Sequence, residues 1–120
     1  EKVVDYAAKK FVVIVDESKL RRRLSGRVPL EILPFAFPLV KRQVLAQFGS
    51  AVAMRRKNGM PALSDNGNVL ADAVFKKIAD PAKLELRLDS VPGVVANGLF
   101  TKNISCVVVG TAEGARMLKR

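Results

Sequence analysis

FVVIVD, at residues 11–16, is the stretch that decides the fold. Its apolar residues follow one another without a break, and most of them are β-branched. This pattern is typical of a strand buried on both faces, as in a parallel α/β sheet. Upstream, apolar residues at positions 3, 4, 7, 8 and 11 recur with helical spacing, and downstream residues 16–27 form a charged loop. Helix, buried strand and polar loop together predict one step of a doubly wound sheet.

Residues 28–100 predict a different arrangement. Apolar residues alternate from Val28 to Leu33, which indicates a half-exposed strand,. Pro38 favours the first turn of a helix, and Gly49 favours its C-terminal cap. The apolar stripe of that helix is expected to comprise Val40, Val44, Leu45 and Phe48. Further elements are expected as strands at 51–55, 69–74 and 94–100 and a helix after Asp80-Pro81. The order β-α-β-β-α-β is the split βαβ, or ferredoxin-like, arrangement.

Asn66-Gly67 predicts a hairpin, because both residues tolerate a positive φ. It lies between 62–63 and the strand at 69–74. The surrounding segment 65–68 has the composition of a calcium loop. It lacks the twelve-residue spacing and the terminal glutamate of such loops, so we interpret it as a turn.

The end of the chain returns to the first pattern. Residues 104–109 predict an apolar strand, and Gly110-Thr111 then predicts a helix with Thr111 as its cap and Glu113 in its first turn,. The expected fold class is α/β, with a ferredoxin-like α+β small domain inserted between two fragments of a Rossmann-like parallel α/β domain. The expected segments are 1–24, 25–101 and 102–120. The two outer fragments are too small to bury both faces of a sheet, so the missing strands and helices are expected from elsewhere.

The chain begins on Glu1, with no methionine and no helix cap before the first helical pattern,. Either the chain was processed or trimmed at this point, or residue 1 comes from the interior of a larger protein in which its carboxylate has a role. Taken alone, Glu1 followed by Lys2 is a common surface pair. Lys19 follows the buried strand, where ligands gather in parallel α/β folds, and it either binds a phosphate or lies in a solvated loop.

Composition excludes several function classes. The chain has no histidine and only Cys106, which excludes a zinc site and a histidine-based triad and favours a reducing, cytoplasmic location,. No segment approaches the ~20 apolar residues of a membrane span, and no signal peptide is evident. The net charge of +10 invites a nucleic-acid partner,. The basic residues are dispersed and the aromatic content is 6%, so a solvated surface or an attraction for small anions is favoured instead,.

Six motifs in order resemble ribose-5-phosphate isomerase of type A, over residues 1 to about 118. They are Glu1-Lys2, the strand FVVIVD with Ser18-Lys19, PLEILPFA at 29–36, SDNGN at 64–68, VPGVV with GLF at 91–100, and VGTAEG at 109–114. The resemblance covers only the C-terminal part of that family, and the motifs that precede Glu1 in the family are absent. Residues 53–62 form a longer connection than is usual in the family, which we expect to be an extended loop.

The resemblance implies an aldose–ketose isomerisation of ribose 5-phosphate and ribulose 5-phosphate through an enediolate. By position, Glu1 matches the family's proton-shuttling glutamate, and Lys19 matches a lysine that contacts the substrate. No cofactor and no metal is implied, because a positioned general base suffices when the oxyanion is stabilised. The implied partners are a sugar phosphate, the missing N-terminal half and further copies in a dimer or tetramer.

Three hypotheses follow for this chain. The first is the C-terminal part of a ribose-5-phosphate isomerase that is catalytic only with its N-terminal half. The second is a non-catalytic oligomerisation module. The third is a basic nucleic-acid-binding ferredoxin-like domain, which the net charge favours and which the lack of aromatics on the middle strands disfavours.

Overall fold

The computed structural model describes residues 1–119, which form two compact units. The central unit is Arg23–Leu99, and the terminal unit combines Glu1–Arg22 with the chain from Phe100 onward. The central unit therefore interrupts the terminal unit in sequence. Residue 120, the last of the predicted segment 102–120, lies outside the described residues.

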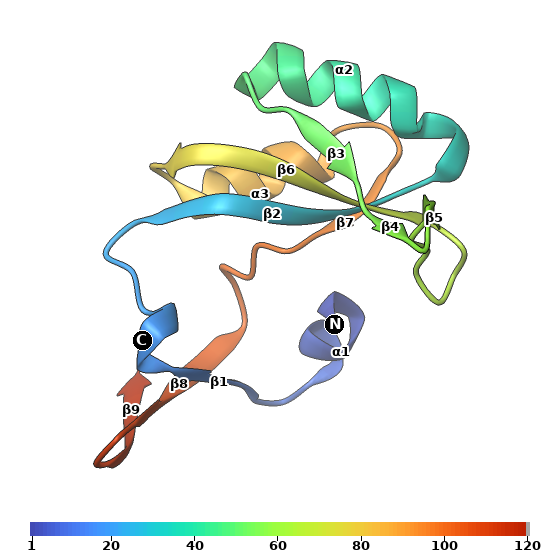
Figure 1. The fold of residues 1–120 in the computed structure, drawn as a ribbon. Helices are drawn as coiled ribbons and strands as arrows, with labels where there is room; N and C mark the ends of the chain where they lie inside the picture. Colours follow the sequence, from blue (N-terminus) through green and yellow to red (C-terminus); the bar gives the residue numbers. More distant parts are fainter. Residues whose placement is uncertain (120) are drawn as a thin grey trace. The chain divides into compact units, whose positions relative to one another are not determined.

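The central unit is built on a four-stranded antiparallel sheet with the strand order β3-β6-β2-β7 (Figure 1). Two α-helices connect its strands, and a short 3-10 helix, η2, precedes the first of them. In chain order the elements are β2 (Leu24–Ile32), η2 (Pro34–Ala36), α2 (Phe37–Phe48), β3 (Val52–Met54), β6 (Val69–Ile78), α3 (Pro81–Asp89) and β7 (Val94–Asn97). The predicted succession of strands and helices in this region is therefore present.

The core of the central unit lies between its sheet and both helices. Along β2, Val28, Leu30 and Ile32 are buried, so the predicted half-exposed strand is confirmed. These side chains form one apolar cluster with residues of α2 and α3, among them Val44 and Leu88. Both helices therefore cover the same face of the sheet.

The predicted helix ends in the central unit are confirmed. Pro38 lies in the first turn of α2, and Gly49 ends that helix with a φ of 65°. The carboxylate of Asp80 accepts a hydrogen bond from the Lys83 backbone N–H at 3.0 Å and so caps α3,. One expectation fails. Leu45 was expected in the buried stripe of α2, but it is exposed, because the buried face of the helix is centred on Val40 and Val44.

Residues 53–62 contain a hairpin rather than the expected extended loop. β4 (Arg56–Lys57) pairs with β5 (Met60–Pro61) around Asn58 and Gly59, whose φ angles are 52° and 77°. An Asn-Gly pair at a two-residue turn was the available sequence signal for this ribbon. At its base, the Arg55 guanidinium donates two hydrogen bonds to the Asp72 carboxylate on β6, at 2.7 and 2.8 Å.

The Asn66-Gly67 hairpin is confirmed, with one difference in its turn. The Ser64 N–H donates to the Asn68 carbonyl at 2.8 Å, and Leu63 forms a bridge with Val69. Gly67 has a φ of 78°, whereas Asn66 does not adopt a positive φ. The turn therefore needs only one residue in the left-handed region.

Glu31 on β2 ties this hairpin to the sheet. Its carboxylate accepts hydrogen bonds from the Ser64 hydroxyl at 2.6 Å and the Asn68 side-chain amide at 3.0 Å. These two hydrogen bonds lower the pKa of Glu31, because they favour the ionised form,.

Replacing Glu31 by Gln is expected to lower the free energy of unfolding by about 1 kcal/mol at neutral pH. Because the folded state lowers the pKa of this carboxyl, its contribution is present above the ordinary pKa of 4.5. The contribution is lost as the pH falls through the folded-state pKa. Urea unfolding of both proteins at about pH 7 and about pH 3 measures it. The difference in the free energy of unfolding between the parent protein and Glu31→Gln should be smaller at the lower pH. An equal difference at both pH values would contradict this role of the carboxylate.

The terminal unit has a three-stranded sheet with the order β1-β8-β9. β1 pairs with β8 in parallel, as predicted for its apolar run, and β8 pairs with β9 in antiparallel fashion. The elements are α1 (Lys2–Ala7), β1 (Phe11–Asp16), the 3-10 helix η1 (Glu17–Lys19), β8 (Ile104–Thr111) and β9 (Gly114–Lys119).

The predicted helix after Thr111 is wrong, because the chain forms the β8–β9 hairpin there. The Thr111 hydroxyl accepts from the Glu113 N–H at 3.3 Å and donates to the Gly114 carbonyl at 3.1 Å. Gly114 has a φ of 136°, which ends any helical continuation,. Thr111 is therefore a turn residue and not a helix cap. In place of the helix, residues Gly114–Lys119 pair with β8 as an antiparallel strand.

The prediction that residues 11–16 are buried on both faces is also wrong for this chain. Along β1, Ile14 is 78% exposed and Val12 is 45% exposed, whereas the alternate residues are half-buried. α1 shows a similar departure, because Val3 and Val4 of its predicted apolar stripe are exposed. Both elements therefore present apolar side chains that the described residues leave uncovered.

Candidate active site

An open depression of about 800 Å³ lies at the carboxyl ends of β1 and β8. Parallel strands end at the same edge of a sheet, which is where ligands bind in α/β folds. Its lining belongs entirely to the terminal unit and comprises Ile14, Val15, Asp16, Glu17, Ser18, Lys19, Val108, Gly110, Thr111, Ala112 and Ala115. The site thus combines an apolar floor from the two strands with a polar wall from η1.

Asp16 shapes that polar wall. Its carboxylate accepts hydrogen bonds from the Ser18 backbone N–H, at 2.9 Å, and from the Ser18 hydroxyl. The bond from the hydroxyl is the main cause of a lowered pKa at Asp16,. The carboxylate is therefore ionised near neutral pH and caps η1.

Lys19 closes η1 and lines the depression, with its side chain exposed. A lysine ammonium is a point charge that binds phosphate oxygens without a fixed geometry. Asp16 and Glu17 line the same depression, so carboxylates and the ammonium stand close to one another there. The sequence-based candidate Lys19 therefore lies in the wall of the depression.

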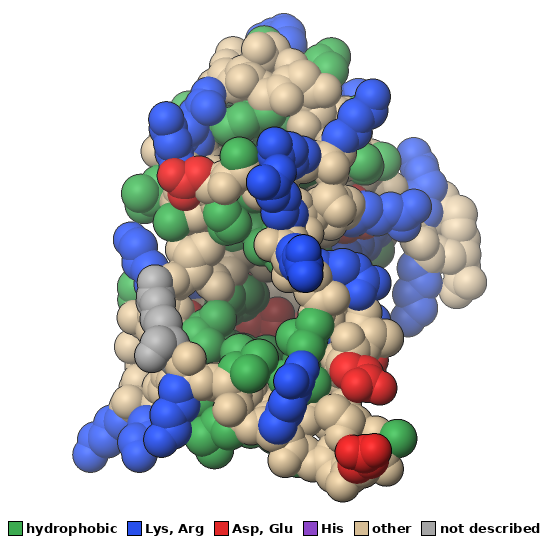
Figure 2. Space-filling view, turned by 90° about the vertical axis from the view of Figure 1, so that its left-hand side faces the viewer, with side chains coloured by type: hydrophobic (Ala, Val, Ile, Leu, Met, Phe, Trp, Pro, Cys, Tyr) green, Lys and Arg blue, Asp and Glu red, His purple; other side chains and the backbone are tan. Residues whose placement is uncertain are grey.

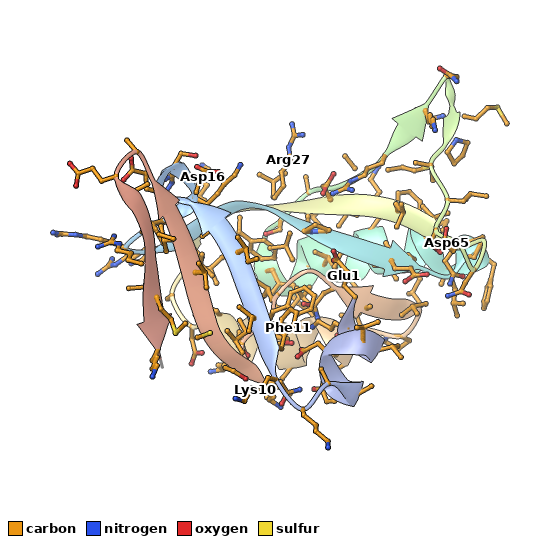
Figure 3. The ribbon with its side chains drawn as sticks, turned by 90° about the horizontal axis from the view of Figure 1, so that it is seen from below. Glu1, Lys10, Phe11, Asp16, Arg27 and Asp65 are labelled. Carbon is orange, nitrogen blue, oxygen red and sulfur yellow. The ribbon has the colours of Figure 1, made fainter. Side chains whose placement is uncertain are left out.

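Glu1 lies at the start of α1, outside the lining of the depression. Its carbonyl accepts the Asp5 backbone N–H at 2.9 Å, and its side chain is exposed. Figure 3 labels Glu1 at α1 and shows Asp16 at the end of β1 that is remote from Phe11. Among the described residues, no hydrogen bond or ion pair joins the two predicted site residues, Glu1 and Lys19.

The sequence reasoning missed a buried carboxylate, Asp5, one helical turn after Glu1. Its side chain is 3% exposed, and its Oδ1 atom has no hydrogen-bond partner within residues 1–119. The four-residue spacing places Asp5 and Glu1 on the same side of α1. That spacing was the available signal, but the apolar residues around it dominated the helical pattern.

The described chain offers no evident place for a metal ion, because no three His, Cys, Asp or Glu side chains gather within residues 1–119. Over the same residues, every helix is too short or too polar to cross a membrane.

Comparison with known proteins gives one family. The sequence matches Ribose 5-phosphate isomerase A (phosphoriboisomerase A) over residues 1–114. It is 45% identical to ribose-5-phosphate isomerase A of Methanocaldococcus jannaschii, with 100% of this chain and 54% of the relative covered. The corresponding protein of Methanothermobacter thermautotrophicus is 44% identical, with 99% and 54% covered. The chain spans about half the length of these relatives.

Solved structures agree with the sequence matches. Ribose 5-phosphate isomerase A from Methanocaldococcus jannaschii aligns with a TM-score of 0.90 and 41% identity, covering 99% of this chain and 53% of that one. A D-ribose-5-phosphate isomerase in complex with phospho-erythronic acid aligns with a TM-score of 0.92 and 37% identity, over 99% and 53%. The described fold is therefore similar to the C-terminal part of such proteins.

Proposed function

The chain belongs to the ribose 5-phosphate isomerase A family, and on that premise we propose that it is the C-terminal part of an enzyme interconverting ribose 5-phosphate and ribulose 5-phosphate. The observation that carries the proposal is the family match over residues 1–114, which includes both Glu1 and Lys19. The depression at the ends of two parallel strands, with Lys19 in its wall, supports an anionic ligand.

The proposed reaction moves one proton between neighbouring carbons. The Glu1 carboxylate removes the C2 proton of open-chain ribose 5-phosphate, and the electron pair forms the C1–C2 double bond while negative charge moves to O1. Glu1 then returns the proton to C1. The O2 hydroxyl loses its proton, O1 gains one, and C2 becomes the carbonyl carbon of ribulose 5-phosphate. The positively charged Lys19 ammonium contacts the anionic substrate.

The apolar surface of the terminal unit supports a requirement for the N-terminal half. Val3, Val4 and Tyr6 of α1 are exposed, and so are Val12 and Ile14 of β1. Exposed apolar side chains on two elements of one small unit support a surface that another part of a protein covers. This chain covers 54% of its Methanocaldococcus jannaschii relative, and we propose that the remaining part of such a protein covers this apolar surface.

The central unit supports a ferredoxin-like assignment. Its strand order β3-β6-β2-β7, with α2 and α3 on one face, is that of the split βαβ arrangement,. We propose that this unit is a small domain inserted in a parallel α/β domain, of which the β1–β8 pair is a part. The free Cys106 on β8 is compatible with the reducing, cytoplasmic location that the sequence predicts,.

A nucleic-acid partner is not supported. On the face drawn in Figure 2, apolar and acidic side chains are present as well as Lys and Arg side chains. A binding titration with random RNA at increasing salt tests this alternative, because phosphate contacts give a steep loss of affinity with salt.

Mixing this chain with the N-terminal segment of its Methanocaldococcus jannaschii relative is expected to produce ribose-5-phosphate isomerase activity. The chain alone and the N-terminal segment alone are expected to show none, because neither has both the Glu1 base and the groups that the preceding half supplies. Conversion of ribose 5-phosphate, followed by NMR, measures this. Comparable activity of the isolated chain would contradict the need for a second half.

The same experiment separates catalysis from assembly. If the two parts form a stable complex by size-exclusion chromatography and the complex has no activity, the catalytic proposal fails. The hypothesis of a non-catalytic oligomerisation module would then stand. Dimers or tetramers of the active complex would support the homo-oligomer implied by the resemblance.

A further inference from the structure

We propose that Asp16, Ser18 and Arg21 form a turn clamp that positions Lys19 for sugar-phosphate binding, an inference that rests on the proposed function. In this role the three residues act through Lys19, so they are positioning residues. The clamp holds the backbone on both sides of Lys19, and it is built entirely within the terminal unit.

The first half of the clamp precedes Lys19. The Asp16 carboxylate accepts hydrogen bonds from both the backbone N–H and the hydroxyl of Ser18. One side chain thereby fixes the start of η1 and the rotamer of Ser18. A charged acceptor makes these bonds stronger than neutral ones.

The second half of the clamp follows Lys19. The Nη1 atom of Arg21 donates to the carbonyls of Ser18, at 2.5 Å, and Leu20, at 2.8 Å. These carbonyls belong to the residues immediately before and after Lys19. The Leu20 N–H also donates to the Glu17 carbonyl at 3.1 Å, which closes the turn.

The clamp matters because lysine has a long, flexible stem. Binding an anion with Lys19 costs less conformational entropy when the backbone that carries the side chain is already ordered. The clamp also engages the Asp16 carboxylate with Ser18. Asp16 and Glu17 line the depression, and both would repel a phosphate. An ordered Lys19 ammonium offsets part of that repulsion when an anion binds at this wall.

The kinetic consequence is a change in substrate affinity. Lys19 is expected to interact with the sugar phosphate both in the ground state and in the transition state of the reaction. Loss of such an interaction raises KM and leaves kcat nearly unchanged. In the active complex, Ser18→Ala is therefore expected to raise KM about fivefold, which corresponds to about 1 kcal/mol.

A double-mutant cycle tests whether Ser18 acts through Lys19. Ser18→Ala should raise KM in the parent protein and have no further effect in a Lys19→Met background. Ser18→Thr, which keeps the hydroxyl, should restore the parent KM. Arg22→Gln, at an exposed neighbouring position, is the matched control and should leave KM unchanged. Equal effects of Ser18→Ala in both backgrounds would overturn the proposal.

A second measurement does not depend on activity. In ¹⁵N relaxation of the 120-residue chain, the Ser18 and Lys19 amides should be as rigid as those of β1, and Ser18→Ala should make them mobile. Mobile amides in the parent chain would overturn the clamp whether or not the complex is active. Rigid amides in a complex without activity would leave the clamp intact and refute the proposed function instead.

Discussion

Glu1→Gln is expected to lower kcat for ribose 5-phosphate isomerisation about 10³-fold in the active complex of this chain with the N-terminal segment. The substitution keeps the size of the side chain and replaces the carboxylate by a neutral amide, which cannot accept the C2 proton. A positioned general base contributes about 10² to 10⁴ in rate, so its loss is the largest single effect expected from one residue here.

The measurement is the rate of ribulose 5-phosphate formation, together with exchange of the C2 proton in deuterated water. Both rates should fall together, because both depend on proton removal. Glu113→Gln is the matched control: it removes an exposed carboxylate at the β8–β9 turn and should leave both rates unchanged. Near-normal exchange in Glu1→Gln would mean that another group is the base. The buried carboxylate of Asp5 is the first one to test.

Leu88→Ala is expected to lower the free energy of unfolding of the central unit by about 3 kcal/mol. Leu88 lies on α3 with 0% of its side chain exposed, and it belongs to the single apolar cluster beneath both helices. The substitution removes buried methyl groups and leaves a cavity that the surrounding sheet fills only in part. The free energy of unfolding of a natural domain is about 5–15 kcal/mol, so this loss is a large fraction of the stability.

Leu86→Ala is the matched control for Leu88→Ala, because Leu86 lies on the same helix with 52% of its side chain exposed. The two substitutions are chemically identical and differ only in burial. For a unit of this size, the midpoint of thermal unfolding should fall by more than about 12 °C for Leu88→Ala and by only about 2 °C for Leu86→Ala. Similar shifts in the two variants would contradict the described docking of α3.

Much of the central unit was predictable, because its signals are local. The alternation at Val28, Leu30 and Ile32 depends on the two-residue period of a strand with one buried face,. Asp80 with Pro81 specifies a helix start through one cap and one fixed φ,. Asn58-Gly59 is an equally local hairpin signal, and the structure has a hairpin there instead of the expected extended loop.

The terminal unit was less predictable, because its signals depend on what packs against it. Gly110-Thr111 suits a helix cap and a strand turn equally well, and the edge of β8 decides in favour of the turn by pairing with β9. The apolar run at 11–16 predicts burial on both faces, but burial requires covering elements that the described residues do not contain. Periodicity shows which side chains favour burial and does not show whether anything covers them.

For the candidate site, the amino-acid sequence alone is enough to select Glu1 and Lys19 as candidate residues. Lys19 follows a strand that is predicted from its own residues, without reference to the strands beside it. The motifs that contain Glu1 and Lys19 lie in the region that matches one family. The surroundings of these residues depend on the fold. The parallel pairing of β1 with β8 forms the depression, Asp16 and Arg21 bond to the turn around Lys19, and Asp5 is buried. The physical reason is that a motif is a property of neighbours along the chain. A site is a property of neighbours in space, and those depend on which strands pair and which faces are covered.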